Sequence, residues 1–151
     1  MRSCVQCVTY LIVLGVTAFI LGRVVPKRWF RHDQFPFHVA NPQKESDLYN
    51  ALGVKTWKDK LPDMSVILPG VLPSKRLPAT ITPEHIMMMV EETCIAEWVH
   101  LLLLLLGSVC FIIWKNVVCR IISIVYGVGN LLYIIIQRYN RPKLLRLLEI
   151  S

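Results

Sequence analysis

The stretch ETCIAEWVHLLLLLL, residues 92–106, joins a polar, charged half to a run of six leucines. On an α-helix, at about 100° per residue, Thr93, Glu97 and His100 fall within about 60° of one another, with Glu92 at the edge of that face. A charge beside hydrocarbon is costly unless it is hydrated, paired or neutralised. The stretch therefore predicts a helix that enters a membrane and carries a polar site at its mouth.

The leucine run belongs to one of three apolar blocks. Of the 151 residues, 54% are hydrophobic, and they gather in residues 5–25, 95–114 and 117–136 rather than being dispersed. Each block approaches the roughly 20 residues that a helix needs to cross a bilayer. We expect an all-α integral membrane protein with three transmembrane helices.

The blocks divide the chain into three parts. Residues 1–25 form the first transmembrane helix, residues 26–91 a cytoplasmic, interfacial segment with short helices, and residues 92–151 a transmembrane hairpin with a polar stripe and a basic tail. The first block also resembles a secretory signal, because Arg2 precedes it. No small-x-small cleavage pattern follows, and residues 26–31 are typical of an interfacial stop, which favours a retained helix.

Basic residues predict the orientation. Arg2 alone precedes the first block, whereas four basic residues crowd its far end: Arg23, Lys27, Arg28 and Arg31. Two basic residues lie between the second and third spans, at positions 115 and 120, and four follow the third block. Under the positive-inside rule, the amino terminus is expected to lie outside and both the central segment and the carboxyl terminus in the cytoplasm. The net charge of +7 is explained by this topology and by anionic lipid, or by a phosphorylated donor. Nucleic acid is not an expected partner, because the basic residues follow span ends rather than forming a free patch.

The central segment predicts short helices and an extended stretch. One helix is expected to begin near Ser46 and to end at Gly53, and another to begin at Thr56 and to stop at residues 61–62. An extended stretch follows at Pro69, Pro73 and Pro78. Aromatic side chains mixed with lysines and arginines suit a membrane surface; they are Trp29, Phe30, Phe35, Phe37, Tyr49 and Trp57.

The helix that contains the opening stretch is expected to begin at Thr82, an N-cap residue followed by proline at the first helical position. It is expected to run unbroken to Trp114. On the third block, a second polar stripe lies on one helical face: Asn130, Tyr133, Gln137 and Arg141. Because the last two spans are antiparallel, both stripes lie at the same depth. We expect them to face each other, with Glu97 or Glu92 paired to Arg138 or Arg141.

This polar constellation has several interpretations. One is a structural clamp that fixes helix pairing. Another is a catalytic site in which His100 is a general base and Glu97 orients it, with oxyanion or phosphate donors among Asn130, Gln137, Arg138 and Asn140. The pattern Glu97-x-x-His100 is also half of a dicarboxylate metal motif. The other histidines lack a matching motif, so we expect no metal.

Five cysteines do not indicate a disulfide scaffold, because all of them lie within or beside apolar blocks. They are Cys4, Cys7, Cys94, Cys110 and Cys119. Small hydrophobic side chains embedded in the membrane are the expected role, and the pair Cys4-x-x-Cys7 is a weak signal by itself.

At these residues the chain resembles the glycosyl-4,4'-diaponeurosporenoate acyltransferase family of the bacterial staphyloxanthin carotenoid pathway. The resemblance runs from about residue 23 to residue 147 and rests on EETCIAEWVH, on QRYNRP after the third span and on WKDKLPD upstream. It implies site residues at Glu92, Glu97 and His100. It also implies substrate-binding residues at Asn130, Gln137, Arg138, Tyr139, Asn140, Arg141, Trp57 and Lys58.

The activity implied by the resemblance is esterification of a sugar hydroxyl, on a glycosylated membrane lipid or a carotenoid glucoside, with a fatty acyl chain. We expect direct transfer from a fatty acyl thioester without a further cofactor, because no serine or cysteine is placed as a nucleophile. The alternative is a non-enzymatic membrane subunit or scaffold of a lipid or pigment synthesis complex. Three spans make a thin bundle, so a homo-oligomer or a membrane-enzyme partner is also expected.

Overall fold

A computed structural model describes residues 2–39, 41–62 and 82–150, and the regular structure in these ranges is entirely helical. The expected extended stretch at Pro69, Pro73 and Pro78 lies outside the described residues. The helices follow in chain order: α1 (Arg2–Val24), η1 (Lys27–Trp29), α2 (Pro42–Ala51), α3 (Val54–Trp57), η2 (Lys58–Lys60), α5 (Pro83–Gly107), α6 (Val109–Ile113) and α7 (Val117–Ile150).

Three of the described helical stretches are long and apolar enough to cross a membrane: α1, the α5–α6 stretch (Pro83–Ile113) and α7. At about 1.5 Å per residue, the 23 residues of α1 already match a hydrocarbon core of about 30 Å. The expectation of an all-helical membrane protein with three membrane-length helices is therefore confirmed.

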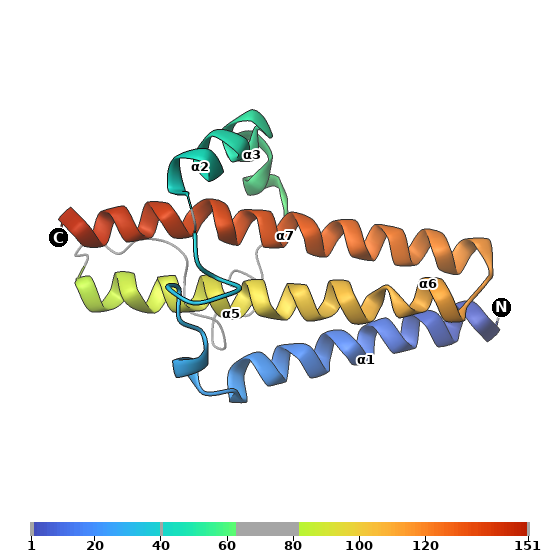
Figure 1. Ribbon diagram of the computed structural model, residues 1–151. Coiled ribbons are helices and arrows are strands. Elements are labelled where there is room, and N and C mark those ends of the chain that lie inside the picture. Colours follow the sequence, from blue (N-terminus) through green and yellow to red (C-terminus); the bar gives the residue numbers. More distant parts are fainter. Residues whose placement is uncertain (1, 40, 63–81, 151) are drawn as a thin grey trace.

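The three long helices lie side by side (Figure 1), with α5 antiparallel to both α1 and α7. Two contacts show how α1 is aligned on α5. The Tyr10 hydroxyl donates to the carbonyl of Leu106 at 3.1 Å, and Gly22 lies so close to α5 that a Cβ atom there would be 2.7 Å from Val99 Cγ2. A small residue thus lets the two backbones approach closely, as is common between membrane helices.

Capping residues set the boundaries of α5 and α7. The Thr82 hydroxyl accepts from the backbone N–H of His85 at 3.3 Å, as its sequence position predicts, and Asn116 Oδ1 accepts from the N–H of Val118 at 2.8 Å. The prediction of an unbroken helix to Trp114 was wrong, because α5 ends at Gly107 and α6 follows it. The break falls at Ser108, whose hydroxyl donates to the Leu105 carbonyl at 2.6 Å. Hydrogen bonds from a serine hydroxyl to a carbonyl of the preceding turn often bend helices.

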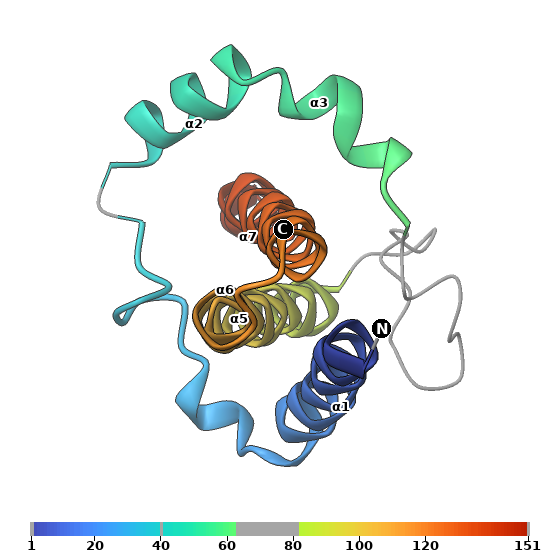
Figure 2. The same cartoon turned by 90° about the vertical axis from the view of Figure 1, so that its right-hand side faces the viewer.

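The connecting segment curves around the α5–α7 pair. In the end view of Figure 2 the described chain after α1 passes α5, carries α2 and α3 across α7 and continues beyond it. Helix α2 begins at Pro42 rather than near Ser46, because Asn41 Oδ1 accepts from the N–H of Lys44 at 3.0 Å. It ends before Gly53, whose φ of 61° is the left-handed conformation that favours glycine.

Thr56 does not begin a helix as predicted. It lies inside α3, and its hydroxyl donates to the carbonyl of Gly53 at 2.7 Å. Leu61 is extended after η2, as expected at a helix stop before proline.

Aromatic side chains attach this segment to the bundle. Phe30 and Phe37 are buried with Cys94 and Ile95 of α5, and Tyr49 is buried with Val54 and with Tyr139 of α7. The same expected interfacial set also contains exposed members, namely Trp29 and Phe35. Part of the set therefore packs on protein, and the position of the segment relative to a membrane surface stays a prediction.

Candidate functional site

The two polar stripes predicted from the sequence face each other between α5 and α7. Residues of the two stripes contact one another in pairs along the antiparallel helices. The pairs run from the end of the bundle that is expected to be cytoplasmic towards its middle. The pairs are Arg141 with Thr93, Arg138 and Arg141 with Glu97, and Asn130 with His100. The predicted apposition of the stripes is confirmed.

Glu97 is the electrostatic centre of this interface. Its Oε1 accepts from Arg138 Nε at 2.7 Å and its Oε2 accepts from Arg141 Nη2 at 2.5 Å. Glu97 is 3% exposed and Arg141 is 0% exposed, so these charges have little access to solvent. Each carboxylate oxygen therefore takes a charge-assisted hydrogen bond, which compensates the removal of the ions from water.

The same arginines hold the connecting segment. Arg138 Nη2 donates to the Pro36 carbonyl at 2.6 Å, and Arg141 Nη1 donates to the Phe37 carbonyl at 2.8 Å. Glu45 of α2 adds a longer ion pair, 3.7 Å from Arg138 Nη1. The carboxylate of α5, the arginines of α7 and the chain after α1 thus form one hydrogen-bonded unit, as the clamp interpretation requires.

His100 makes a different contact from the one expected. Its Nδ1 lies 2.9 Å from Asn130 Oδ1, while Asn130 Nδ2 donates to the Tyr126 carbonyl at 2.8 Å. Because the amide nitrogen faces a carbonyl, its oxygen must face the histidine, and a neutral imidazole then carries its proton on Nδ1. The lone pair that can accept a proton lies on Nε2. Asn130, rather than Glu97, occupies the orienting position in the described structure.

Tyr133 completes the surroundings of the imidazole. Its ring stacks on that of His100 with centroids 4.7 Å apart and planes 9° apart, and its hydroxyl donates to the Pro62 carbonyl at 2.7 Å. The imidazole is thus fixed by a stacked ring and by a hydrogen bond at Nδ1. Sequence reasoning placed Tyr133 on the correct helical face but did not include it in the site.

Other predicted substrate-binding residues form a separate cluster where α2 and α3 cross α7. Tyr139 is buried there with Tyr49, with Trp57 packed beside them, and Lys58 Nζ lies 5.9 Å from the centre of the Tyr139 ring. Burial, together with the negative charge of Glu45, raises the pKa of Tyr49 to about 12. This cluster packs the connecting segment onto α7.

The two remaining predicted residues on α7 differ in exposure. Gln137 is buried, and Asn140 is half-buried. Gln137 lies one turn beyond Tyr133 on the same face.

Glu92 belongs to a third group, at the end of α1. Its carboxylate accepts two hydrogen bonds from Arg23, at 2.7 and 3.2 Å, and lies 3.8 Å from Lys27 Nζ. The expected pairing of Glu97 or Glu92 with an arginine of α7 is therefore confirmed, and Glu97 rather than Glu92 makes it. The physical reason is that α1 packs against α5 with its basic end beside Glu92.

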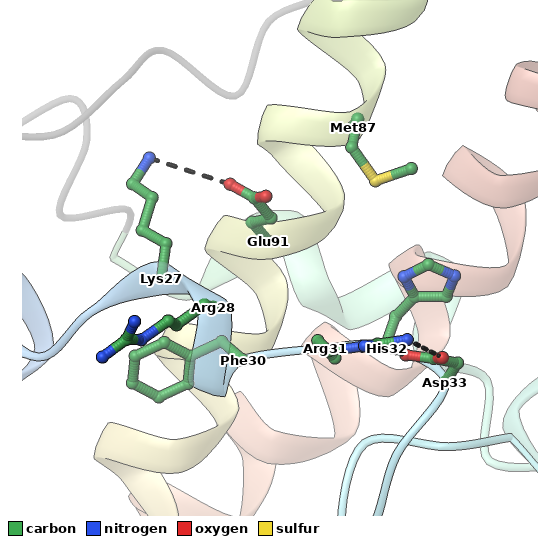
Figure 3. A pocket seen from close by; sticks show the side chains of 8 residues that line it. All are labelled: Lys27, Arg28, Phe30, Arg31, His32, Asp33, Met87 and Glu91. Atoms are coloured by element: carbon green, nitrogen blue, oxygen red, sulfur yellow. Dashed lines mark hydrogen bonds and ion pairs between the residues drawn. The ribbon is translucent and has the colours of Figure 1, made fainter.

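A hollow of about 260 Å³ lies beside this third group (Figure 3). Lys27, Arg28, Arg31 and His32 line it together with Glu91 of α5. Lys27 is 3.9 Å from Glu91, and Arg31 donates to Asp33 at 2.6 Å, so two of its cations are already paired. Arg31 also holds the pKa of the exposed Asp33 carboxyl below its ordinary value. None of the residues expected to carry chemistry lines this hollow.

The fold and the site together define a helical membrane protein with a histidine, fixed by an amide and a tyrosine, beside a buried arginine–glutamate cluster. The chain belongs to the glycosyl-4,4'-diaponeurosporenoate acyltransferase family (CrtO), whose family model matches residues 26–150. The matched range contains α5, α7 and the connecting segment, and therefore every residue of the site. The chain is accordingly an acyltransferase.

Two relatives with this name come from Staphylococcus aureus. The protein of strain N315 is 30% identical over 146 residues, and that of strain MRSA252 is 32% identical over 146 residues. Each alignment covers 95% of this chain and 87% of the relative. No solved structure matches the chain.

Proposed function

We propose that the chain esterifies a sugar hydroxyl of a glycosylated membrane lipid or carotenoid glucoside with a fatty acyl group taken from a thioester. The relatives are named for acylation of a glycosylated carotenoid, and the observation that carries the proposal for this chain is the contact between His100 and Asn130. This contact places the imidazole proton on Nδ1, so Nε2 is the nitrogen that can take a proton from the substrate.

The reaction is a direct transfer. His100 Nε2 takes the proton of the sugar hydroxyl while the hydroxyl oxygen attacks the thioester carbonyl. The tetrahedral intermediate then expels the thiolate, which recovers the proton from the imidazolium, so ester and thiol are the products. No further cofactor takes part.

Asn130 holds the imidazole and is not available as the oxyanion donor proposed for it on sequence grounds. Both ends of its amide are engaged, one by His100 and the other by the Tyr126 carbonyl. We assign polarisation of the thioester carbonyl to Gln137 and to the remaining N–H groups of Arg138, which lie further along the same helix towards the polar end.

The depth of the site suits amphipathic substrates. His100 lies eight residues beyond Glu92, about 12 Å along the helix axis, and it is followed by the six leucines. Acyl and isoprenoid chains can then stay in hydrocarbon while the hydroxyl and the thioester meet polar side chains. In this proposal the connecting segment lies on the cytoplasmic membrane surface, the amino terminus lies outside, and a second copy or another membrane enzyme encloses the open side of the thin bundle.

The activity is tested by lipid analysis. A host that makes a glycosylated carotenoid but lacks this class of acyltransferase is compared with and without the chain, by mass spectrometry of extracted pigments. Appearance of the glycoside mass plus one fatty acyl group supports the proposal. An unchanged pigment profile, with the protein present in the membrane, would contradict a carotenoid glycoside as the acceptor.

The role of Asn130 is tested by Asn130→Ala. Loss of the Nδ1 contact should remove part of the roughly 10²–10⁴-fold contribution of a general base, at wild-type abundance in the membrane. Product formed per molecule of protein is the measurement. Unchanged product per molecule would show that the orienting contact has no part in the reaction.

A further inference from the structure

Four of the five cysteines gather at the end of the bundle opposite the arginine–glutamate cluster. Cys7, Cys110 and Cys119 are fully buried in one apolar cluster, and Cys4 packs against it. Cys119 Sγ lies 3.7 Å from Cys4 Sγ. The fifth, Cys94, is buried elsewhere with Phe30, Phe37 and Ile95. The four clustered cysteines therefore come from α1, α6 and α7 only.

We propose that Cys4 and Cys119 are a site of oxidative modification, in which an intramolecular disulfide joins α1 to α7. Within the described parts of the chain, no group of three or more His, Cys, Asp or Glu side chains is arranged to hold a metal ion. The sulfur pair, in contrast, is already in contact across two helices that are distant in sequence.

Exposure decides the order of the reaction. Cys4 is partly exposed near the start of α1, whereas Cys119 is fully buried. The Cys4 thiolate therefore attacks a low-molecular-weight disulfide first and releases one thiolate from it. The Cys119 thiolate then displaces the second thiolate from the mixed disulfide. The two protons of the protein thiols pass to the released thiolates, so one disulfide forms as another is reduced.

The cross-link would close a loop of more than 100 residues, because it joins the third residue of α7 to a residue near the start of α1. Closing a long loop restricts the unfolded chain strongly and stabilises the folded one. The charge distribution predicts that this end of the bundle lies outside the cell, where disulfides persist. Cys119 is eleven residues from Asn130, about 16 Å along α7, so the site does not include the cross-link.

The experiment uses the purified full-length chain in lipid nanodiscs, incubated with oxidised or with reduced glutathione. Free thiols are then blocked, and tryptic peptides are identified by mass spectrometry. The expected product after oxidation joins residues 3–23 to residues 116–120, with the loss of two hydrogen atoms, and it is absent after reduction. Oxidation that yields only glutathione adducts, or a link to Cys110, would overturn the proposal.

Serine variants identify the reacting pair, since residues 3–23 contain both Cys4 and Cys7. Cys7→Ser should keep the linked peptide, and Cys4→Ser should lose it. The opposite pattern would assign the cross-link to Cys7 and refute the pair proposed here.

Thermal stability supplies a second readout that does not depend on acyl transfer. The unfolding midpoint of the wild-type chain and of the control Cys94→Ser should be higher after oxidation than after reduction. The midpoint of Cys4→Ser should not respond to glutathione. Equal midpoints of the oxidised and reduced wild-type chain would contradict a stabilising cross-link, whatever the pigment assay shows.

Discussion

Replacing Glu97 by glutamine should destabilise the protein far more than an isosteric change normally does. Glu97 is 3% exposed and is the counterion of Arg141, which is 0% exposed. Removing one partner of a buried pair leaves an uncompensated charge and costs about 3–5 kcal/mol. The cost of leaving Arg138 without Glu97 is smaller, because its side chain is 28% exposed and lies 3.7 Å from Glu45. Most of the cost therefore falls on Arg141.

Glu92→Gln on the same helix is the matched control. Glu92 also accepts from an arginine, but the pair with Arg23 has side-chain exposures of 17% and 30%. Such a pair near the surface contributes roughly 0.2–1 kcal/mol. The same chemical change should thus have a small effect at position 92 and a large one at position 97.

The assay is the free energy of unfolding in detergent, with abundance in the membrane measured in parallel. A double-mutant cycle sharpens it: adding Arg141→Met to Glu97→Gln should restore part of the lost stability, because the stranded cation is gone. Equal losses for Glu97→Gln and Glu92→Gln, or simple additivity in the cycle, would refute the buried-pair explanation.

Two further predictions concern packing and ionisation. Gly22→Ala should weaken the contact of α1 with α5 by about 1–3 kcal/mol, because the added Cβ would meet Val99. Gly15→Ala is the control, since nothing lies within 4 Å of a Cβ at that position. The unfolding midpoint in detergent should fall for Gly22→Ala and not for Gly15→Ala. The pKa of Tyr49 is raised from 10.0 to about 12, so the folded state favours the neutral phenol. The contribution of Tyr49 to the free energy of unfolding should be complete below pH 10 and should be lost as the pH approaches 12. An absorbance titration of Tyr49→Phe should show one late-titrating tyrosinate fewer than that of the wild-type chain; equal numbers in the two proteins would contradict the assignment.

Helical periodicity explains why the main polar interface could be predicted from the sequence. Glu97 and His100 share a face of one span, Asn130 and Arg141 share a face of the next, and a tight turn between antiparallel spans fixes their depth. These constraints suffice to bring the two faces together. They do not decide which atom bonds to which, so Asn130 rather than Glu97 contacts His100.

Other parts of the site depend on tertiary placement that periodicity does not contain. The carbonyls of Pro36 and Phe37 accept from the arginines, and backbone groups leave no signature in residue type. The partner of Glu92 depends on where α1 docks, because Arg23 is distant in sequence and adjacent only after packing. The signal available was the basic end of α1, which the sequence interpretation assigned to topology and anionic lipid or to a phosphorylated donor.

The most direct test of His100 as the general base is acyl transfer by the variant His100→Gln. Glutamine keeps a polar group that can bond to Asn130 but cannot accept a proton near neutral pH. We predict wild-type abundance in the membrane with a loss of acylated glycoside on the order of 10²- to 10⁴-fold. Wild-type product formation by His100→Gln would contradict the base and leave the polar interface as a structural clamp.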